Sequence, residues 1–469
     1  MNRLPLASLL LSTTLSVAAH AQQSNPTPQP TPDPGAKPAT EPAPGSAELA
    51  SDAASAPKLD TEASFKFAIP DISLPGGGQK GDVGLSPGDT PTAAGDEMYD
   101  MDIPRRGVFH FPAIEDPVDN LVKSLRSFEE RTGLRVNFAY TMLFQQATGG
   151  PGDRNGAAGD ADFMTAWTLL GRGTENAGTL IFTGEYRFKM GEQTPSQLGG
   201  VLGTLTNTTS AFNGRGWVVR DAYWLQRLLD GKLRLLAGRG DISDFIGGMR
   251  MQNANNSFLN RAFSGNAAVA YPAGHGPLAG ISIVPNDFFY VTAGVQNAYS
   301  TSTTLGLNTL NEGSFFYGAE VGITPNFEGV GRGRYRIMGW YMDDRSLLNL
   351  PSDEGISLMA DQDFGDRILG FARYGHSNGD VTNIKNMGQL GVGVRGLLGS
   401  PDDLTGLAAS IAEPATAGLR NEKVVEVFHR WQLTVRTQFT IGAQLIVDPS
   451  NAPNDDTLGV FSARFRFDF

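Results

Sequence analysis

Hydrophobic and polar residues alternate along several separated stretches of the chain. After Gly133, polar residues alternate with an apolar set made of Val136, Phe138, Tyr140, Met142 and Phe144. The same period of two recurs over residues 438–447 and 460–469, and in the second stretch one face carries Phe461, Ala463, Phe465, Phe467 and Phe469. A period of two indicates β-strands that have one apolar face and one wetted face.

Repeated along the chain, this pattern predicts about sixteen strands. They are expected at residues 133–146, 162–170, 178–189, 216–229, 232–240, 278–284, 287–297, 313–323, 333–343, 355–363, 367–376, 387–398, 404–411, 422–433, 437–447 and 457–469. Short turns such as Asp230-Gly231 mostly alternate with long connections such as 147–161, 190–215 and 241–277. Tight turns on one rim and long loops on the other are typical of membrane barrels. A sheet that faces lipid must also close, because its open edges would find no water. The predicted fold is therefore all-β, a transmembrane antiparallel β-barrel over residues 133–469.

Five aromatic residues lie near the ends of predicted strands. They are Trp217, Tyr223, Trp340, Tyr341 and Trp431. Because amphipathic rings favour the membrane–water interface, we expect these residues to form interfacial girdles.

The part of the chain before the barrel divides into three segments. Residues 1–21 combine Arg3, an apolar run and Ala19-His20-Ala21, which is the pattern of a secretory signal peptide. Residues 22–105 are rich in Pro and Gly and are expected to be a disordered periplasmic spacer. Residues 106–132 are expected to contain one amphipathic helix that begins at Asp116-Pro117 and ends at Gly133. This helix is interpreted either as a plug or mouth element or as a helix that packs on its neighbour.

Composition narrows the function classes. The chain has 469 residues, with 37 basic against 49 acidic side chains, and its net charge of −12 argues against a nucleic-acid partner. The 58 glycines suit a turn-rich β-protein, and the absence of cysteine excludes disulfides, thiolate metal sites and cysteine nucleophiles. The five histidines lack ligand spacing, and neither GxSxG nor HExxH occurs. We therefore expect no metal, no cofactor and no enzymatic activity.

Two long stretches carry a family resemblance. Gly216–Phe245 and Ser257–Ala298 resemble the carbohydrate-selective porin family, the OprB type of Gram-negative outer membranes, and so does the closing segment from Glu426 to Phe469. The similarity extends over about residues 115–469. It implies a sixteen-stranded outer-membrane barrel that admits glucose and related sugars by diffusion, contacts outer-membrane lipid and forms a homotrimer.

The wetted faces of the strands supply candidate sugar-binding residues. A barrel of this size has a water-filled lumen, so selectivity must come from whatever narrows it. We expect the loop at 241–277 to fold inward and to present Asp244, Arg250 and Asn253. Strand parity places further wall residues inward, namely Glu185, Arg187, Glu320, Glu426 and Arg430. Arg220 and Asp221 are adjacent, so alternation allows only one of them to face the lumen, and Arg239 lies near the loop rim.

Other interpretations of this pattern remain open. Each of these charges is also consistent with an ordinary wetted lumen residue or with a salt bridge that braces the barrel. The pore itself is alternatively a general or cation-favouring porin, because the chain is acidic overall. A further alternative is a structural barrel that is plugged and linked to the cell wall. An enzyme is ranked last, because no catalytic constellation stands out.

Overall fold

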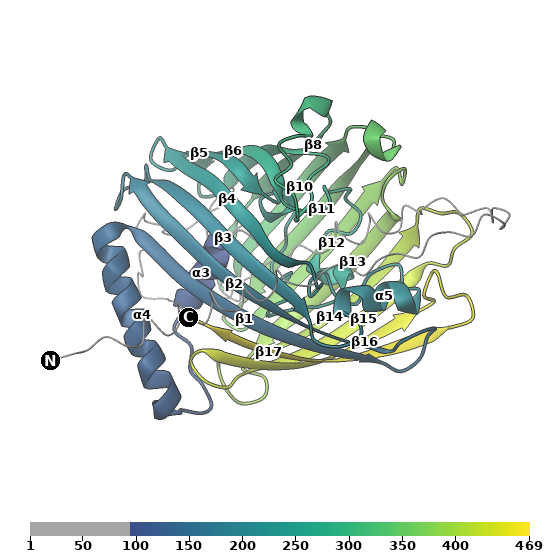
Figure 1. Ribbon diagram of the computed structural model, residues 1–469, viewed down its shortest axis with the longest axis horizontal. Coiled ribbons are helices and arrows are strands. Elements are labelled where there is room, and N and C mark those ends of the chain that lie inside the picture. The colour runs from purple at the N-terminus through teal and green to yellow at the C-terminus, as the bar shows by residue number, and fades with distance from the viewer. Residues whose placement is uncertain (1–93) are drawn as a thin grey trace, which may run out of the picture. The chain divides into compact units, whose positions relative to one another are not determined.

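The computed structural model describes residues 94–469. The signal peptide predicted at 1–21 lies outside the described residues, and so do residues 22–93 of the spacer predicted at 22–105. The described part is dominated by a single antiparallel sheet (Figure 1).

The sheet closes into a barrel. Its 17 strands pair in sequence order, β8 pairs with β10, and β1 pairs with both β2 and β17. Because β9 covers only two residues and pairs with β10 alone, sixteen strands form the ring. The strands are β1 Leu134–Ala147, β2 Asn155–Leu170, β3 Gly178–Lys189, β4 Gly216–Leu228, β5 Leu233–Gly240, β6 Gly276–Asn286, β7 Phe289–Asn297, β8 Phe315–Ile323, β9 Asn326–Phe327, β10 Gly331–Met342, β11 Asp353–Phe364, β12 Ile368–Ser377, β13 Ile384–Arg395, β14 Leu404–Pro414, β15 Glu422–Gln432, β16 Thr437–Val447 and β17 Thr457–Asp468.

The predicted barrel is thus confirmed, with small shifts in strand ends. The largest shift is in β2, which begins at Asn155 rather than at residue 162. The additional residues continue the pairing with β1 as far as Gln146, so the first long connection is shorter than predicted. Short turns gather at the rim where β1 begins and β17 ends, and the longest connections, 190–215 and 241–275, lie at the other rim.

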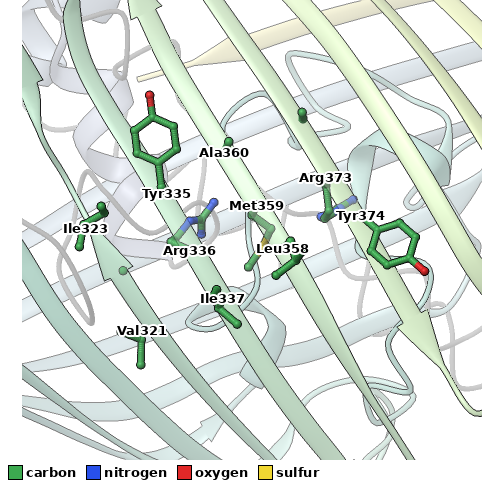
Figure 2. Close-up of a pocket in the computed structure, with 12 residues that line it drawn as sticks. Val321, Ile323, Tyr335, Arg336, Ile337, Leu358, Met359, Ala360, Arg373 and Tyr374 are labelled. Carbon is green, nitrogen blue, oxygen red and sulfur yellow. The ribbon is translucent and has the colours of Figure 1, made fainter.

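The two faces of the wall have opposite chemistry. On β17 the outward Phe461 is 57% exposed, while the inward Arg464 and Arg466 are each 2% exposed. The outer face of β8 and β10–β12 carries an apolar depression of about 590 Å³ (Figure 2). Its exposed lining includes Val321, Ile337, Leu358 and Tyr374. An apolar exterior around a charged interior is the arrangement that a lipid bilayer requires.

Two of the five predicted interfacial aromatics face the interior instead. Tyr223 is 2% exposed and meets Phe245 edge-on, with ring centroids 5.4 Å apart. Trp340 is 5% exposed and stacks on Phe316, with centroids 6.3 Å apart. Because side chains alternate along a strand, Trp340 and its neighbour Tyr341 cannot both face lipid. The girdle interpretation was wrong for Tyr223 and Trp340.

Four helices accompany the described strands. They are α3 Ala94–Asp102, α4 Pro112–Thr132, α5 Pro195–Leu202 and α6 Arg261–Ser264. Three short 3-10 helices cover Ile242–Asp244, Leu310–Glu312 and Ser346–Leu348. Among the described residues, no helix is both long and apolar enough to cross a membrane.

The structure corrects two expectations for the segment before β1. Ala94–Asp102 forms α3, so the end of the predicted disordered spacer is helical. The amphipathic helix, α4, begins at Pro112 rather than at Pro117, which lies inside it. Pro112 takes the early helical position that proline favours, and Glu115 accepts a hydrogen bond from the Phe111 N–H, so the first turn forms upstream of Asp116. The predicted end is correct, because Gly133 adopts a left-handed conformation with φ 76°.

Candidate functional site

Charged side chains on β2, β3 and β4 form one cluster on the inner wall. Arg187 Nη2 lies 2.8 Å from Glu185 Oε1, and Arg187 Nε lies 3.2 Å from Asp160 Oδ2. Arg215, which precedes β4, donates to the other oxygen of Glu185. Arg220 Nη1 lies 3.7 Å from Asp162 Oδ1. These carboxylates are buried, and each lies close to a guanidinium group that offsets its charge.

A β-bulge allows Arg220 and Asp221 to face the lumen together. The register between β3 and β4 passes from Thr183 opposite Asp221 to Gly184 opposite Val219, which leaves Arg220 without a partner of its own. Arg220 and Asp221 are at most 1% exposed, and Arg220 Nε donates to Asp221 Oδ2 at 2.9 Å. A bulge adds one residue to a strand and reverses the parity beyond it. The expectation that only one of the two could face inward was therefore wrong.

Residues 241–275, here called the β5–β6 loop, bond to the inner wall of distant strands. Glu320 of β8 accepts from the Gly247 N–H at 2.9 Å, and its other oxygen lies 3.6 Å from Arg336 of β10. Arg250 Nη1 lies 2.9 Å from Asp363 Oδ1, and the Arg250 N–H donates to Asp361 at 3.0 Å. Arg336 also donates to the Gly248 carbonyl, so the first half of the loop is joined to β8, β10 and β11.

The tip of the β5–β6 loop is held from the opposite wall. Both oxygens of Glu426 on β15 accept backbone hydrogen bonds, from Leu259 N–H at 2.7 Å and from Asn260 N–H at 2.8 Å. Arg430 donates to the Asn256 carbonyl at 3.0 Å, and Arg464 of β17 donates to the Ser257 carbonyl at 2.9 Å. Acceptors on β15 and donors on β15 and β17 thus satisfy the backbone of a loop that has no regular pairing of its own.

Aromatic packing accompanies these polar anchors. Phe258 of the loop meets Phe428 edge-on, with ring centroids 4.9 Å apart, and also lies against Phe371 and Phe263. All four rings are buried. The loop therefore has a small apolar core of its own against the wall, which orders its tip.

The remaining predicted residues are Arg239 at the end of β5, and Asp244 and Asn253 in the β5–β6 loop. Arg239 donates to the carbonyls of Thr304 at 2.6 Å and Ser302 at 3.0 Å, so it braces the 298–314 connection. Asp244 lies near Asp221 and His275. Asn253 is fully buried and accepts from the Asn255 N–H at 2.7 Å. His275 is also fully buried, and its burial together with nearby arginines lowers its pKa well below the usual value, so the ring is neutral.

The segment before α4 enters the same interior. On α3, Glu97 is 1% exposed and lies 2.7 Å from Arg466 of β17. Asp100 pairs with Arg105 at 2.6 Å, and Arg105 pairs with Asp468 at 3.0 Å. Since Arg466 and Asp468 project from the inner face of β17, α3 lies inside the barrel near the short-turn rim.

A cavity of about 300 Å³ lies between the β5–β6 loop and the connections that join β10 to β11, β12 to β13 and β14 to β15. Arg261 and Arg345 offer donors, Asp380 offers acceptors, and Thr382 and the ring of Tyr271 complete a mixed polar and apolar lining. Burial without an offsetting charge lowers the pKa of Arg261 to about 10. Arg345, Asp380 and Thr382 were missed by the sequence analysis, because they come from loops that only barrel closure brings together.

Within residues 94–469, two groups have the spacing of metal ligands. Asp221, Asp244 and His275 form one, and Asp160, Asp162 and Glu185 form the other. In both groups an arginine already bonds to a carboxylate, Arg220 to Asp221 and Arg187 to Glu185. A cation would have to compete with that guanidinium, so neither group is assigned as a metal site.

Comparison with known proteins identifies a matching family and solved structures that are similar to this chain. The sequence model of the carbohydrate-selective porin, OprB family, matches residues 173–469. The high-pH structure of Pseudomonas putida OprB has 16% identity, covers 74% of this chain and 97% of its own, and superposes with a TM-score of 0.63. OmpF from Salmonella typhi, in complex with daunomycin, has 10% identity, covers 72% of this chain and 97% of its own, and gives a TM-score of 0.47. No curated protein matches the sequence.

Proposed function

The chain belongs to the carbohydrate-selective porin family, OprB type, and is an outer-membrane porin; on this premise we propose that its pore passes sugars such as glucose by passive diffusion. No catalytic step is involved. The β5–β6 loop would narrow the lumen, and its contacts with β8, β10, β11, β15 and β17 support this role.

The observation that carries the proposal is the lining of the 300 Å³ cavity beside the β5–β6 loop. A sugar hydroxyl both donates and accepts, so a site for it needs donors and acceptors side by side, and its C–H face favours an aromatic ring. Arg261, Arg345, Asp380 and Tyr271 supply these groups. Moderate binding at this cavity suits a channel that must release its solute.

The charges deeper in the lumen fit a neutral solute. Glu185 and Asp160 offset the charges of Arg187 and Arg215. Across the lumen, a second cluster balances three carboxylates against three guanidinium groups, those of Glu320, Asp361 and Asp363 against those of Arg250, Arg334 and Arg336. Such pairs present polar atoms without a strong net field, so a polyhydroxylated solute can exchange hydrogen bonds along them. The candidate residues predicted from the sequence are therefore proposed to shape and brace this path. They are Glu185, Arg187, Arg220, Asp221, Arg239, Asp244, Arg250, Asn253, Glu320, Glu426 and Arg430.

Block of ion current by sugar tests the proposal. In planar bilayers, glucose added on the loop side should reduce the current through the wild-type channel in a saturable manner. The double variant Arg261→Gln, Arg345→Gln should need roughly tenfold more glucose for the same block, the loss of about one hydrogen bond. Lys385→Gln removes a charge from an exposed position outside the cavity and should behave as wild type. Equal block in all three proteins would contradict the assignment.

One observation favours a second candidate, the plugged structural barrel. α3 lies inside the barrel and the β5–β6 loop fills part of the interior, so both elements occupy space that a solute would need. Open-channel conductance separates the two, because a plugged barrel would conduct no ions. The general or cation-favouring pore would conduct without saturable sugar block. The homotrimer stays a prediction, to be tested by the mass of the detergent-solubilised complex.

A further inference from the structure

The chain leaves the barrel interior and then follows the outside of the short-turn rim. Arg106 Nε lies 3.6 Å from Asp402 in the β13–β14 turn, and Val108 N–H donates to the Gln432 carbonyl at 3.0 Å. Farther along, Asp119 of α4 pairs with Arg436 in the β15–β16 turn at 3.2 Å.

The far end of α4 reaches the next strands around the rim. Trp167 Nε1 of β2 donates to the Thr132 carbonyl at 3.3 Å, and Arg172 in the β2–β3 turn donates to the Glu130 carbonyl at 3.4 Å. α4 therefore passes successive strand ends from β15 to β2, so its axis runs around the barrel rather than along it. Figure 1 shows α4 lying across the end of the sheet.

α4 lies on the lipid side of the wall. A cavity of about 340 Å³ between the helix and the barrel is lined by Ile114 and Val118 from α4 and by Phe465 and Phe467 from β17. These phenylalanines alternate with the inward Arg464 and Arg466, so they project from the outer face. The helix thus adjoins wall residues that contact the bilayer.

The surface of α4 divides into three faces. Glu115, Val118 and Glu129 are at least partly covered and face the rim, where Glu129 bonds to Arg135 of β1 at 2.9 Å. A second face carries Ile114, Leu121 and Phe128 at seven-residue spacing, and these side chains are 66%, 43% and 37% exposed. The third face is polar and exposed, and it consists of Asp116, Asn120, Lys123, Ser127 and Glu130.

We propose that α4 is an interfacial membrane helix whose stripe of Ile114, Leu121 and Phe128 is embedded in the phospholipids of the periplasmic leaflet. The occupant is lipid because the stripe continues the apolar outer wall at the rim, and tight turns mark the periplasmic side of an outer-membrane barrel. An amphipathic helix parallel to the membrane plane buries one apolar face at the headgroup boundary while its polar face stays in water. Exposed Phe109 and Phe111 prolong the stripe upstream. The leaflet thereby fixes the point at which the chain turns into the lumen.

Single-cysteine spin labelling tests this proposal directly, because the chain contains no cysteine. Labels are placed at Leu121→Cys and Ile114→Cys on the stripe and at Asn120→Cys and Ser127→Cys on the polar face. The full chain is reconstituted in phospholipid vesicles, and collision rates are measured with oxygen, which concentrates in lipid, and with a water-soluble nickel chelate. All four positions are at the surface, so the substitutions should not prevent folding. Heat-dependent mobility on gels verifies that each variant has folded.

The stripe positions should show an oxygen-to-nickel collision ratio several-fold higher than the polar positions. A high nickel collision rate at all four positions would overturn the proposal, since the stripe would then lie in water. Low collision rates with both reagents at Leu121→Cys would also overturn it, because the stripe would then be covered by protein, as in contact with a second copy of the chain. Repeating the measurement in detergent-free outer-membrane vesicles should give the same order of ratios.

Discussion

Replacing Glu426 by glutamine should release the tip of the β5–β6 loop. The carboxylate is 1% exposed, and its two oxygens accept the Leu259 and Asn260 backbone N–H groups at 2.7 and 2.8 Å. Hydrogen bonds to a charged group contribute about 1.5–3 kcal/mol each. Glutamine keeps one acceptor oxygen but loses the charge and the second acceptor, so roughly 3 kcal/mol of anchoring disappears.

This loss can be measured as a labelling rate. About 3 kcal/mol corresponds to a roughly 100-fold larger population of released loop. Ser257 is fully buried beside the anchor, and a cysteine introduced there reacts with a thiol reagent only when the tip opens. The rate for Ser257→Cys should therefore rise roughly 100-fold in the Glu426→Gln background.

The control is Val427→Ala, because Val427 is 43% exposed on the outer face of the same strand. It should leave the labelling rate of Ser257→Cys unchanged. If Glu426→Gln folds normally and labels no faster than this control, Glu426 does not anchor the loop and the reasoning from its two hydrogen bonds fails.

Three further predictions follow from other parts of the interior. Arg187→Gln leaves the buried Glu185 and Asp160 without that partner, so the free energy of unfolding, measured with urea in vesicles, should fall by about 3–5 kcal/mol. The same variant removes a positive charge from the lumen, so reversal potentials should shift toward cation selectivity. Glu97→Gln weakens the contact of α3 with Arg466, so single-channel conductance should increase; an unchanged conductance would mean that α3 does not obstruct the pore. The pKa of His275 is lowered in the folded protein, so the ring binds a proton more readily in the unfolded chain, and the free energy of unfolding should fall as the pH drops below 6.5. His275→Gln should make the free energy of unfolding depend less on pH in this range.

The strands could be predicted because their signal is local. A period of two is visible within ten residues, and it fixed the inward direction of Glu185, Arg187, Glu320 and Glu426 without knowledge of the partners. The bulge at Arg220 could not be predicted in this way, since it depends on the register between β3 and β4. The same bulge reverses parity before Tyr223, which explains why that ring faces inward.

Contacts across the barrel could not be predicted from the sequence pattern. Arg261, Arg345 and Asp380 meet at one cavity only because ring closure brings three outer connections together. α3 was not anticipated either, because its short amphipathic segment follows a Pro-rich and Gly-rich region whose composition suggested a spacer. Composition describes average behaviour, whereas the position of α3 is set by the specific pairing of Glu97 with Arg466.

Liposome swelling measures whether the pore favours sugars over other solutes of the same size. Vesicles that contain the purified protein are placed in isotonic glucose, a disaccharide or a neutral amino acid of glucose-like size, and the initial swelling rates are compared. Glucose should permeate faster than the size-matched amino acid, because the lining exchanges hydrogen bonds with hydroxyls. Equal rates ordered only by size would contradict sugar selectivity and indicate a general pore, and no swelling with any solute would contradict the porin account and favour the plugged barrel.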